Sequence, residues 1–145
     1  MNNVTQEQMN DRILYELERR EQNPGDICSM LKLKLLDSDA DNGVVTFSHT
    51  VQRIAANPSG NLHGGIISWL MDSSMGILSR SATGYDKTVT MDIHVSYLRA
   101  VHIGDEAVIK AYITHAGRSV INIRSELYAE DKLAATADAL FYKVG

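Results

Sequence analysis

The segment from His63 to Ser81 most constrains how this chain can fold. It is long enough for about five turns of α-helix. Its apolar side chains point around most of the helix circumference, and they are Ile66, Ile67, Trp69, Leu70, Met71, Met75, Ile77 and Leu78. A helix that is apolar on nearly all sides must be enclosed by the rest of the protein. The sequence therefore predicts a central helix with other elements built around it.

The residues before this segment predict one more helix and a β-hairpin. Residues 5–22 carry apolar side chains at helical spacing, and an Asn-Pro-Gly triplet at 23–25 ends the pattern. Two strand-like runs follow at 30–36 and 44–54. The acidic turn at 37–43 between them is typical of a hairpin.

After the central helix, the hydrophobic period changes to two. From Lys87 to Tyr97, apolar residues alternate with polar ones, which predicts a strand with one buried face. Three more strand-like runs, 107–115, 120–128 and 133–144, follow short turns and predict a four-strand antiparallel meander. A sheet encloses the helix best by curving around it. We therefore expect one α+β domain over residues 1–145, with a curved antiparallel sheet around one long central helix and an extra N-terminal helix.

Composition excludes several classes of function. The net charge is −4 and the basic residues are scattered, so no nucleic-acid partner is expected. No stretch approaches the roughly 18 apolar residues of a membrane span. Cys28 is the only cysteine, which excludes an internal disulfide and indicates a reducing, cytoplasmic location. We expect Cys28 to be a small core residue, because no helix start or nearby His would lower the pKa of its thiol.

The residues that carry chemistry lie at the entry to the central helix. The sequence reads Asn57-Pro-Ser-Gly-Asn-Leu-His63-Gly64-Gly65, and Asp72 follows two turns into the helix. Glycines at a helix start leave backbone N–H groups unobstructed, and the helix dipole favours negative charge there, so an oxyanion could be held. A tight loop that lets strand and helix pack closely is the alternative interpretation.

Asp72 is the candidate acid or base. It is flanked by Leu70, Met71 and Met75, and a carboxylate in such surroundings is costly to enclose without compensation. Such groups are retained chiefly for use or in a satisfied network. The functional interpretation is a nucleophile or a general base. The alternatives are a carboxylate bonded to a neighbouring serine of the helix, or one that points to solvent.

These features together resemble the hot-dog-fold acyl-CoA thioesterases of the phenylacetate-degradation (PaaI-like) type. The resemblance covers most of the chain and rests on these motifs: His63-Gly64-Gly65, Asp72, Val89-Thr90-Met91-Asp92, Tyr97-Leu98, Gly104-Asp105 and Gly117-Arg118. It implies a hot-dog fold and hydrolysis of an acyl-CoA thioester to a carboxylic acid and free CoA. It also implies a homodimer, and a homotetramer made by pairing dimers.

The resemblance implies roles for individual residues. The Gly64 N–H would polarise the thioester carbonyl, Asn57 and His63 would orient the thioester or a water, and Thr90 would help to hold the carboxylate or the water. The alternative for Thr90 is a β-branched residue that suits any strand. Among the substrate-binding candidates, Trp69 and Met75 would line the pocket beside Gly65, and Arg118 could bind a CoA phosphate. An exposed turn arginine is the alternative for Arg118.

The spacing of Gly64 and Asp72 has a geometric consequence. Eight residues along a helix correspond to roughly 12 Å, so both cannot reach one thioester carbon from the same helix. If both act, Gly64 of one subunit must meet Asp72 of another across a two-fold interface. The resemblance implies such a shared site.

Two other functions remain open from sequence. One is an enoyl-CoA hydratase or dehydratase on the same fold, and the other is a noncatalytic acyl-CoA-binding module. Neither thioester hydrolysis nor the spacing of the five histidines calls for a metal or a redox cofactor.

Overall fold

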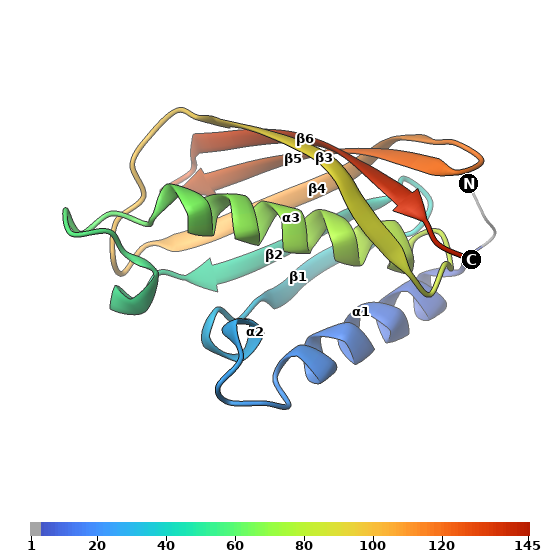
Figure 1. Ribbon diagram of the computed structural model, residues 1–145, viewed down its shortest axis with the longest axis horizontal. Helices are drawn as coiled ribbons and strands as arrows, with labels where there is room; N and C mark the ends of the chain where they lie inside the picture. The colour runs from blue at the N-terminus through green and yellow to red at the C-terminus, as the bar shows by residue number, and fades with distance from the viewer. Residues whose placement is uncertain (1–3) are drawn as a thin grey trace.

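The computed structural model describes residues 4–145, so the first three residues of the expected domain lie outside it. Three helices and a 3₁₀ turn accompany six strands within this range (Figure 1). The helical elements are α1 (Gln6–Arg20), α2 (Ile27–Met30), η1 (Arg53–Ala55) and α3 (Gly64–Ser81). The strands are β1 (Lys34–Asp39), β2 (Val44–Thr50), β3 (Thr88–Tyr97), β4 (Glu106–Ala116), β5 (Val120–Ala129) and β6 (Lys132–Lys143).

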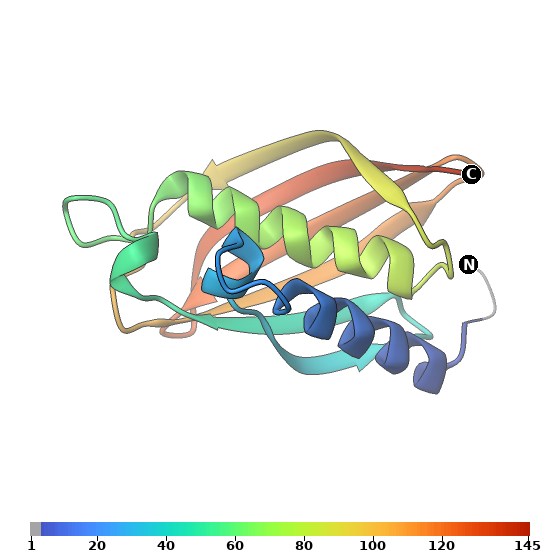
Figure 2. The same ribbon diagram turned by 60° about the horizontal axis from the view of Figure 1, so that its bottom comes forward.

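The strands form one antiparallel sheet in the order β1-β2-β4-β5-β6-β3. The sheet curves, and α3 runs along its inner face, while α1 lies beside α3 and over β1 (Figures 1 and 2). The predicted architecture, a curved antiparallel sheet around one long helix with an N-terminal helix, is therefore confirmed. No helix within residues 4–145 is long and apolar enough to cross a membrane.

The enclosure predicted for the central helix is also present. Leu70, Met71 and Met75 have no exposed surface, and they pack into the core between α3 and the sheet. Two buried serines of α3 bond within the helix, since Ser74 donates to the Leu70 carbonyl at 2.7 Å and Ser79 to the Gly76 carbonyl at 2.7 Å. The buried Ser81 Oγ, by contrast, has no hydrogen-bond partner within residues 4–145.

The predicted four-strand meander is wrong for its first strand. β4, β5 and β6 do form a meander, but β3 pairs with β6 at the opposite edge from β1. The connection between β3 and β4 crosses past the Asn57 loop, where Leu62 N–H donates to the Val101 carbonyl at 2.7 Å. Period-two alternation identifies a strand but does not specify its neighbour, which is why the sequence suggested the simpler order.

The alternation within β3 is interrupted. Thr90 pairs with Phe141 but Asp92 pairs with Leu140, so Met91 is an extra residue, a β-bulge. Residues before the bulge therefore change faces relative to the predicted pattern. Thr90 shares the inner face with Ile93 and Tyr97, while Val89 and Met91, expected on a buried face, are exposed.

Two further predictions are corrected near the N-terminus. The strand expected over 30–36 begins only at Lys34, because the chain first forms α2 behind Asp26. Cys28 lies in α2 and is half-buried, not a core residue. Its Sγ accepts a weak hydrogen bond from Arg20 Nη1 at 3.7 Å. Burial lowers the pKa of the Arg20 guanidinium below its usual value. The electrostatic effect of nearby Cys28 raises the pKa and offsets part of that decrease.

One polar contact inside the helical layer predicts a stability effect. Arg80 of α3 donates to Glu16 of α1 through Nε at 2.8 Å, and its Nη2 lies 2.6 Å from the same oxygen. The side chains are only 18% and 12% exposed. Arg80→Met removes the direct partner of the largely buried Glu16 carboxylate and the Arg80–Thr88 hydrogen bond, so it is expected to lower the free energy of unfolding by about 2–3 kcal/mol. Urea denaturation followed by circular dichroism at fixed protein concentration measures this.

Two matched variants make that measurement specific. Arg80→Met combined with Glu16→Leu removes both charges, so it should recover part of the loss. Arg124→Met breaks the exposed pair with Asp138, 42% and 61% exposed, and should cost less than about 0.5 kcal/mol. If Arg80→Met and Arg124→Met lowered the free energy of unfolding equally, burial would not be the reason that the Arg80–Glu16 pair matters.

Candidate functional site

The loop before α3 is held in a fixed shape by Asn57. Its side-chain Oδ1 accepts from the N–H groups of Ser59 and Asn61, both at 3.1 Å, and its own N–H donates to the Asn61 carbonyl at 2.7 Å. The loop uses the amide oxygen, so the Nδ2 donors remain for a ligand. Asn57 is thus placed as a hydrogen-bond donor beside the start of α3.

His63 caps α3. Its backbone is extended (φ −61°, ψ 134°) and its Nδ1 accepts from the Gly65 N–H at 2.9 Å. A side chain at position 65 would bring Cβ within 3.2 Å of that nitrogen, so glycine permits the close capping contact. Gly64 is the first residue of the helix, and its N–H has no partner within the helix. The helix start therefore offers the Gly64 N–H as an open backbone donor, whereas the Gly65 N–H is used by the cap.

Gly64, Ser68 and Asp72 form a row on the side of α3 that faces β3. Tyr97 Oη donates to the Gly64 carbonyl at 3.0 Å and lies 2.6 Å from Ser68 Oγ. Two turns farther along, Thr90 Oγ1 donates to Asp72 Oδ1 at 2.8 Å. The row follows the i, i+4, i+8 spacing of one helix face, and α3 and β3 run in opposite directions along it.

The Asp72 carboxylate is half-buried, and its partner is Thr90 and not a serine of its own helix. Ser74 bonds to Leu70, and Ser68 bonds to Tyr97. A single hydroxyl donor leaves most of the acceptor sites of the carboxylate available. The hydrogen bond expected between Thr90 and Asp72 is therefore present, and the carboxylate retains capacity to bind water.

The structure keeps the two clusters apart within one chain. Gly64 with Tyr97 lies at the start of α3, and Asp72 with Thr90 lies two turns later, roughly 12 Å away along the axis. One chain consequently presents an open N–H at one place and a carboxylate at another.

The other predicted binding residues are spread around this row. Trp69 is half-buried against the core and Met75 is fully buried. Arg118 is exposed in the turn between β4 and β5, at the end of the sheet that also holds the start of β3. Trp69 and Met75 each lie three residues from Asp72 on α3, whereas Arg118 belongs to a different loop, and the binding roles of all three stay predictions.

Sequence reasoning missed Ser68 and Tyr97. Ser68 could have been found, because it lies four residues from both Gly64 and Asp72 on the same helix face. Tyr97 could not, since the alignment of β3 against α3 depends on the Met91 bulge.

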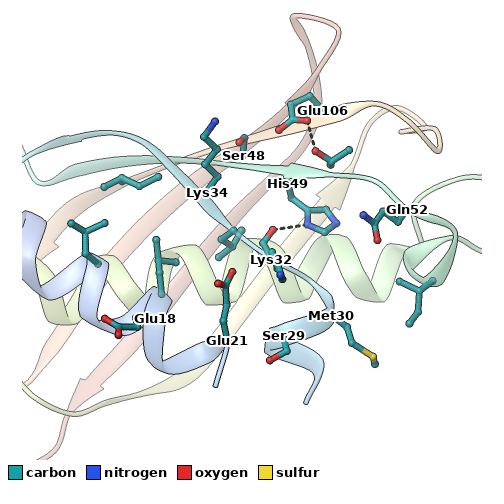
Figure 3. A pocket seen from close by; sticks show the side chains of 16 residues that line it. Glu18, Glu21, Ser29, Met30, Lys32, Lys34, Ser48, His49, Gln52 and Glu106 are labelled. Carbon is teal, nitrogen blue, oxygen red and sulfur yellow. Dashed lines mark hydrogen bonds between the residues drawn. The ribbon is translucent and has the colours of Figure 1, made fainter. Parts of the chain in front are cut away.

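A groove of about 930 Å³ is bordered by α1, α2, β1 and β2 (Figure 3). His49 lies at its floor, 4% exposed, with Nδ1 donating to the Lys32 carbonyl at 2.8 Å. Within residues 4–145, its Nε2 has no hydrogen-bond partner. None of the site residues predicted from the sequence lines this groove. The groove and the row of Gly64, Ser68 and Asp72 are therefore separate features of the single chain.

Comparison with known proteins identifies the family. The profile of the Thioesterase superfamily matches residues 59–135, more than half of the chain. The chain belongs to the thioesterase superfamily. The matched residues of this superfamily member include the start of α3, the row on that helix, and all of β3 to β5.

Two curated relatives share 28–34% identity with parts of this chain. Acyl-coenzyme A thioesterase 13 of Mus musculus is 34% identical over 74 residues, 48% of this superfamily member and 50% of the mouse protein. A putative esterase of Deinococcus radiodurans is 28% identical over 98 residues, 68% of this chain and 64% of that protein. The chain thus spans about half to two thirds of the length of these relatives.

Solved structures share the fold. The Escherichia coli PaaI protein of the phenylacetic acid degradation operon matches with a TM-score of 0.79 at 19% identity, covering 94% of this chain and 96% of that one. A Streptococcus mutans protein bound to acetyl CoA matches with a TM-score of 0.72 at 23% identity, covering 79% and 90%. The hot-dog fold expected from the resemblance is confirmed for this thioesterase-superfamily chain.

Proposed function

We propose that this chain is an acyl-CoA thioesterase that hydrolyses a thioester to a carboxylic acid and free CoA in a site shared by two subunits. The observation that carries the proposal is the Asp72–Thr90 pair, two turns along the same helix from the open N–H of Gly64. Membership in the thioesterase superfamily and the acetyl CoA bound to a structural neighbour support an acyl-CoA substrate.

The residues divide into those that bind the carbonyl and those that supply the nucleophile. The Gly64 N–H, with Asn57 and His63, would hold the thioester oxygen and the negative charge that develops on it. Asp72, oriented by Thr90, would take a proton from water or attack the acyl carbon itself. With water as nucleophile, its oxygen bonds to the acyl carbon, the C–S bond breaks, and CoA leaves as thiolate. No step needs a metal or redox cofactor.

The free edge of β3 supports a shared site. β3 pairs only with β6 within residues 4–145, and its exposed side chains include Val89 and Met91, 42% and 55% exposed. An unpaired edge with exposed apolar residues is suited to pairing with another strand. Antiparallel pairing with the β3 of a second copy would bring Gly64 of one subunit toward Asp72 of the other. The proposed assembly is a homodimer with two equivalent sites, which could pair further into a homotetramer.

The remaining predicted residues complete the proposed site. The half-buried Trp69 would border the acyl group from the α3 side, next to Gly65, and Met75, which has no exposed surface in the single chain, would support that wall from the core. Arg118 would meet a CoA phosphate. An acyl-CoA substrate and the single cysteine suit a cytoplasmic enzyme.

Thiol release from a panel of aryl- and fatty-acyl-CoA esters tests the proposal. The purified chain is expected to release CoA from at least one ester with saturation kinetics, and the preferred ester identifies the acyl group. Loss of the enoyl absorbance of an enoyl-CoA without thiol release would instead indicate a hydratase. Tight binding of acyl-CoA with no turnover on any ester would indicate a binding module.

A further inference from the structure

We infer that Tyr97 is a positioning residue that keeps His63 in the tautomer with its proton on Nε2, where this N–H donates to the thioester oxygen. This inference rests on the proposed thioester hydrolysis and deepens it. It assigns His63 to the carbonyl and not to water, and it leaves proton removal to Asp72.

The tautomer follows from the cap. Gly65 N–H donates to His63 Nδ1 at 2.9 Å, so Nδ1 must present a lone pair. A neutral imidazole then carries its one proton on Nε2. His63 is exposed, and Nε2 has no hydrogen bond to any part of the chain between residues 4 and 145. The free edge of the ring is consequently a donor, which suits an oxyanion and cannot accept a proton from water.

Tyr97 acts on that cap through one peptide group. The Gly64 carbonyl and the Gly65 N–H belong to the same peptide unit, and Tyr97 Oη donates to that carbonyl at 3.0 Å. Because the Tyr97 proton is used there, the 2.6 Å contact requires Ser68 Oγ to donate to Tyr97 Oη. The result is a continuous chain of donors from Ser68 through Tyr97 and the Gly64–Gly65 peptide to His63.

Such a chain strengthens its last bond. A carbonyl that accepts a hydrogen bond makes the N–H of the same peptide a better donor, by about 10–30% per bond in a connected chain. The Tyr97 ring also covers Gly64, with its Cε1 3.5 Å from where a Cβ would lie. Although Tyr97 is 53% exposed, its hydroxyl is committed to the helix start, so it fixes both the position and the polarity of the peptide that holds His63.

Tyr97→Phe tests the inference, because it removes the hydroxyl and keeps the ring. Nitrogen-15 NMR of the imidazoles, with His63 assigned by loss of its signals in His63→Gln, should show His63 protonated on Nε2 in the wild type. In Tyr97→Phe we expect a mixture of both neutral tautomers. Ser68→Ala should shift the mixture in the same direction but less. Tyr142→Phe, a similarly exposed tyrosine of β6, is the matched control and should leave the His63 signals unchanged.

Kinetics separate positioning from structural damage. Losing one hydrogen bond at the helix start should lower kcat about three- to tenfold in Tyr97→Phe, with KM changed less than about twofold and an unaltered melting temperature. Wild-type His63 protonated on Nδ1, or an unchanged tautomer in Tyr97→Phe, would overturn the inference. The NMR readout needs no substrate, so failure of the inference is distinguishable from absence of thiol release, which overturns the proposed function.

Discussion

Replacing Asp72 by Asn is expected to lower the rate of thiol release at least about a hundredfold, the scale on which a general base or nucleophile contributes. Asparagine has the same shape and its amide oxygen can still accept the Thr90 hydrogen bond of 2.8 Å. The substitution therefore removes the charge and the basic oxygen while the contact to β3 persists. Thiol release on the preferred ester, compared as kcat with wild type, measures the effect.

The control for Asp72→Asn is Asp92→Asn. Asp92 is an exposed carboxylate on the same strand as Thr90, but it lies beyond the Met91 bulge and pairs with Leu140 on the outer face. It should retain activity within about twofold, as surface substitutions away from a site usually do. Binding of free CoA should be similar in both variants. An Asp72→Asn enzyme as active as wild type would remove this carboxylate from the mechanism and favour the binding-module interpretation of the fold.

A mixture of two inactive variants is expected to recover about a quarter of wild-type activity, because closed two-fold symmetry makes each site from both subunits. One variant is Asp72→Asn. The other is Gly64→Pro, which removes the proposed oxyanion donor and should by itself cost about a hundred- to a thousandfold in kcat. In a random mixture half of the dimers are mixed, and each mixed dimer holds one intact and one doubly substituted site.

Gly64→Pro is chosen because the local backbone can accept it. Gly64 is the first residue of α3, where proline is tolerated because that N–H has no helical partner. His63 before it has φ −61° and ψ 134°, the extended conformation required of a residue preceding proline. Circular dichroism checks the fold of the variant. If proline disturbs the helix start, Asn57→Ala replaces it, because Asn57 is also proposed to bind the thioester oxygen.

The mixing experiment distinguishes a shared site from a site within one chain. Subunits carrying different affinity tags are denatured together, refolded and purified through both tags, so that mixed dimers are isolated directly. These isolated dimers should have about half of wild-type activity, because one of their two sites is intact. Wild type taken through the same procedure gives the reference activity. Mixed dimers that stay as inactive as either parent would contradict the shared site.

The architecture was predictable because it depends on strong periodic patterns. The apolar circumference of α3 requires enclosure, and the strand periodicity after it supplies the enclosing sheet. The open N–H of Gly64 also follows from local rules for helix starts, whereas the cap at His63 was not predicted. Hence the central helix, its entry loop and the candidate carboxylate Asp72 could all be named from sequence.

The relation between α3 and β3 could not be predicted. Strict alternation places Thr90 and Tyr97 on opposite faces of β3, yet both contact the same helix. The Met91 bulge reconciles them, since one extra residue reverses the facing of everything before it. Nothing in the pattern of side chains marks where a strand will bulge, so the Ser68–Tyr97 contact appears only in the folded chain. The inward position of Thr90 was expected from the family resemblance and not from the alternation of side chains.

The pairing of β3 with β6 determines when the candidate site can form. β3 carries Thr90 and Tyr97, but its only partner strand among residues 4–145 comes last in the chain, after β4 and β5. Contacts between residues so distant in sequence are made late, because loop closure must precede them. During synthesis, α3 is therefore present with its carboxylate before the strand that orients it has a place in the sheet. The chain can assemble its chemistry only when β6 has emerged, so a stalled or shortened product that lacks β6 retains the helix start but leaves Asp72 without a fixed partner.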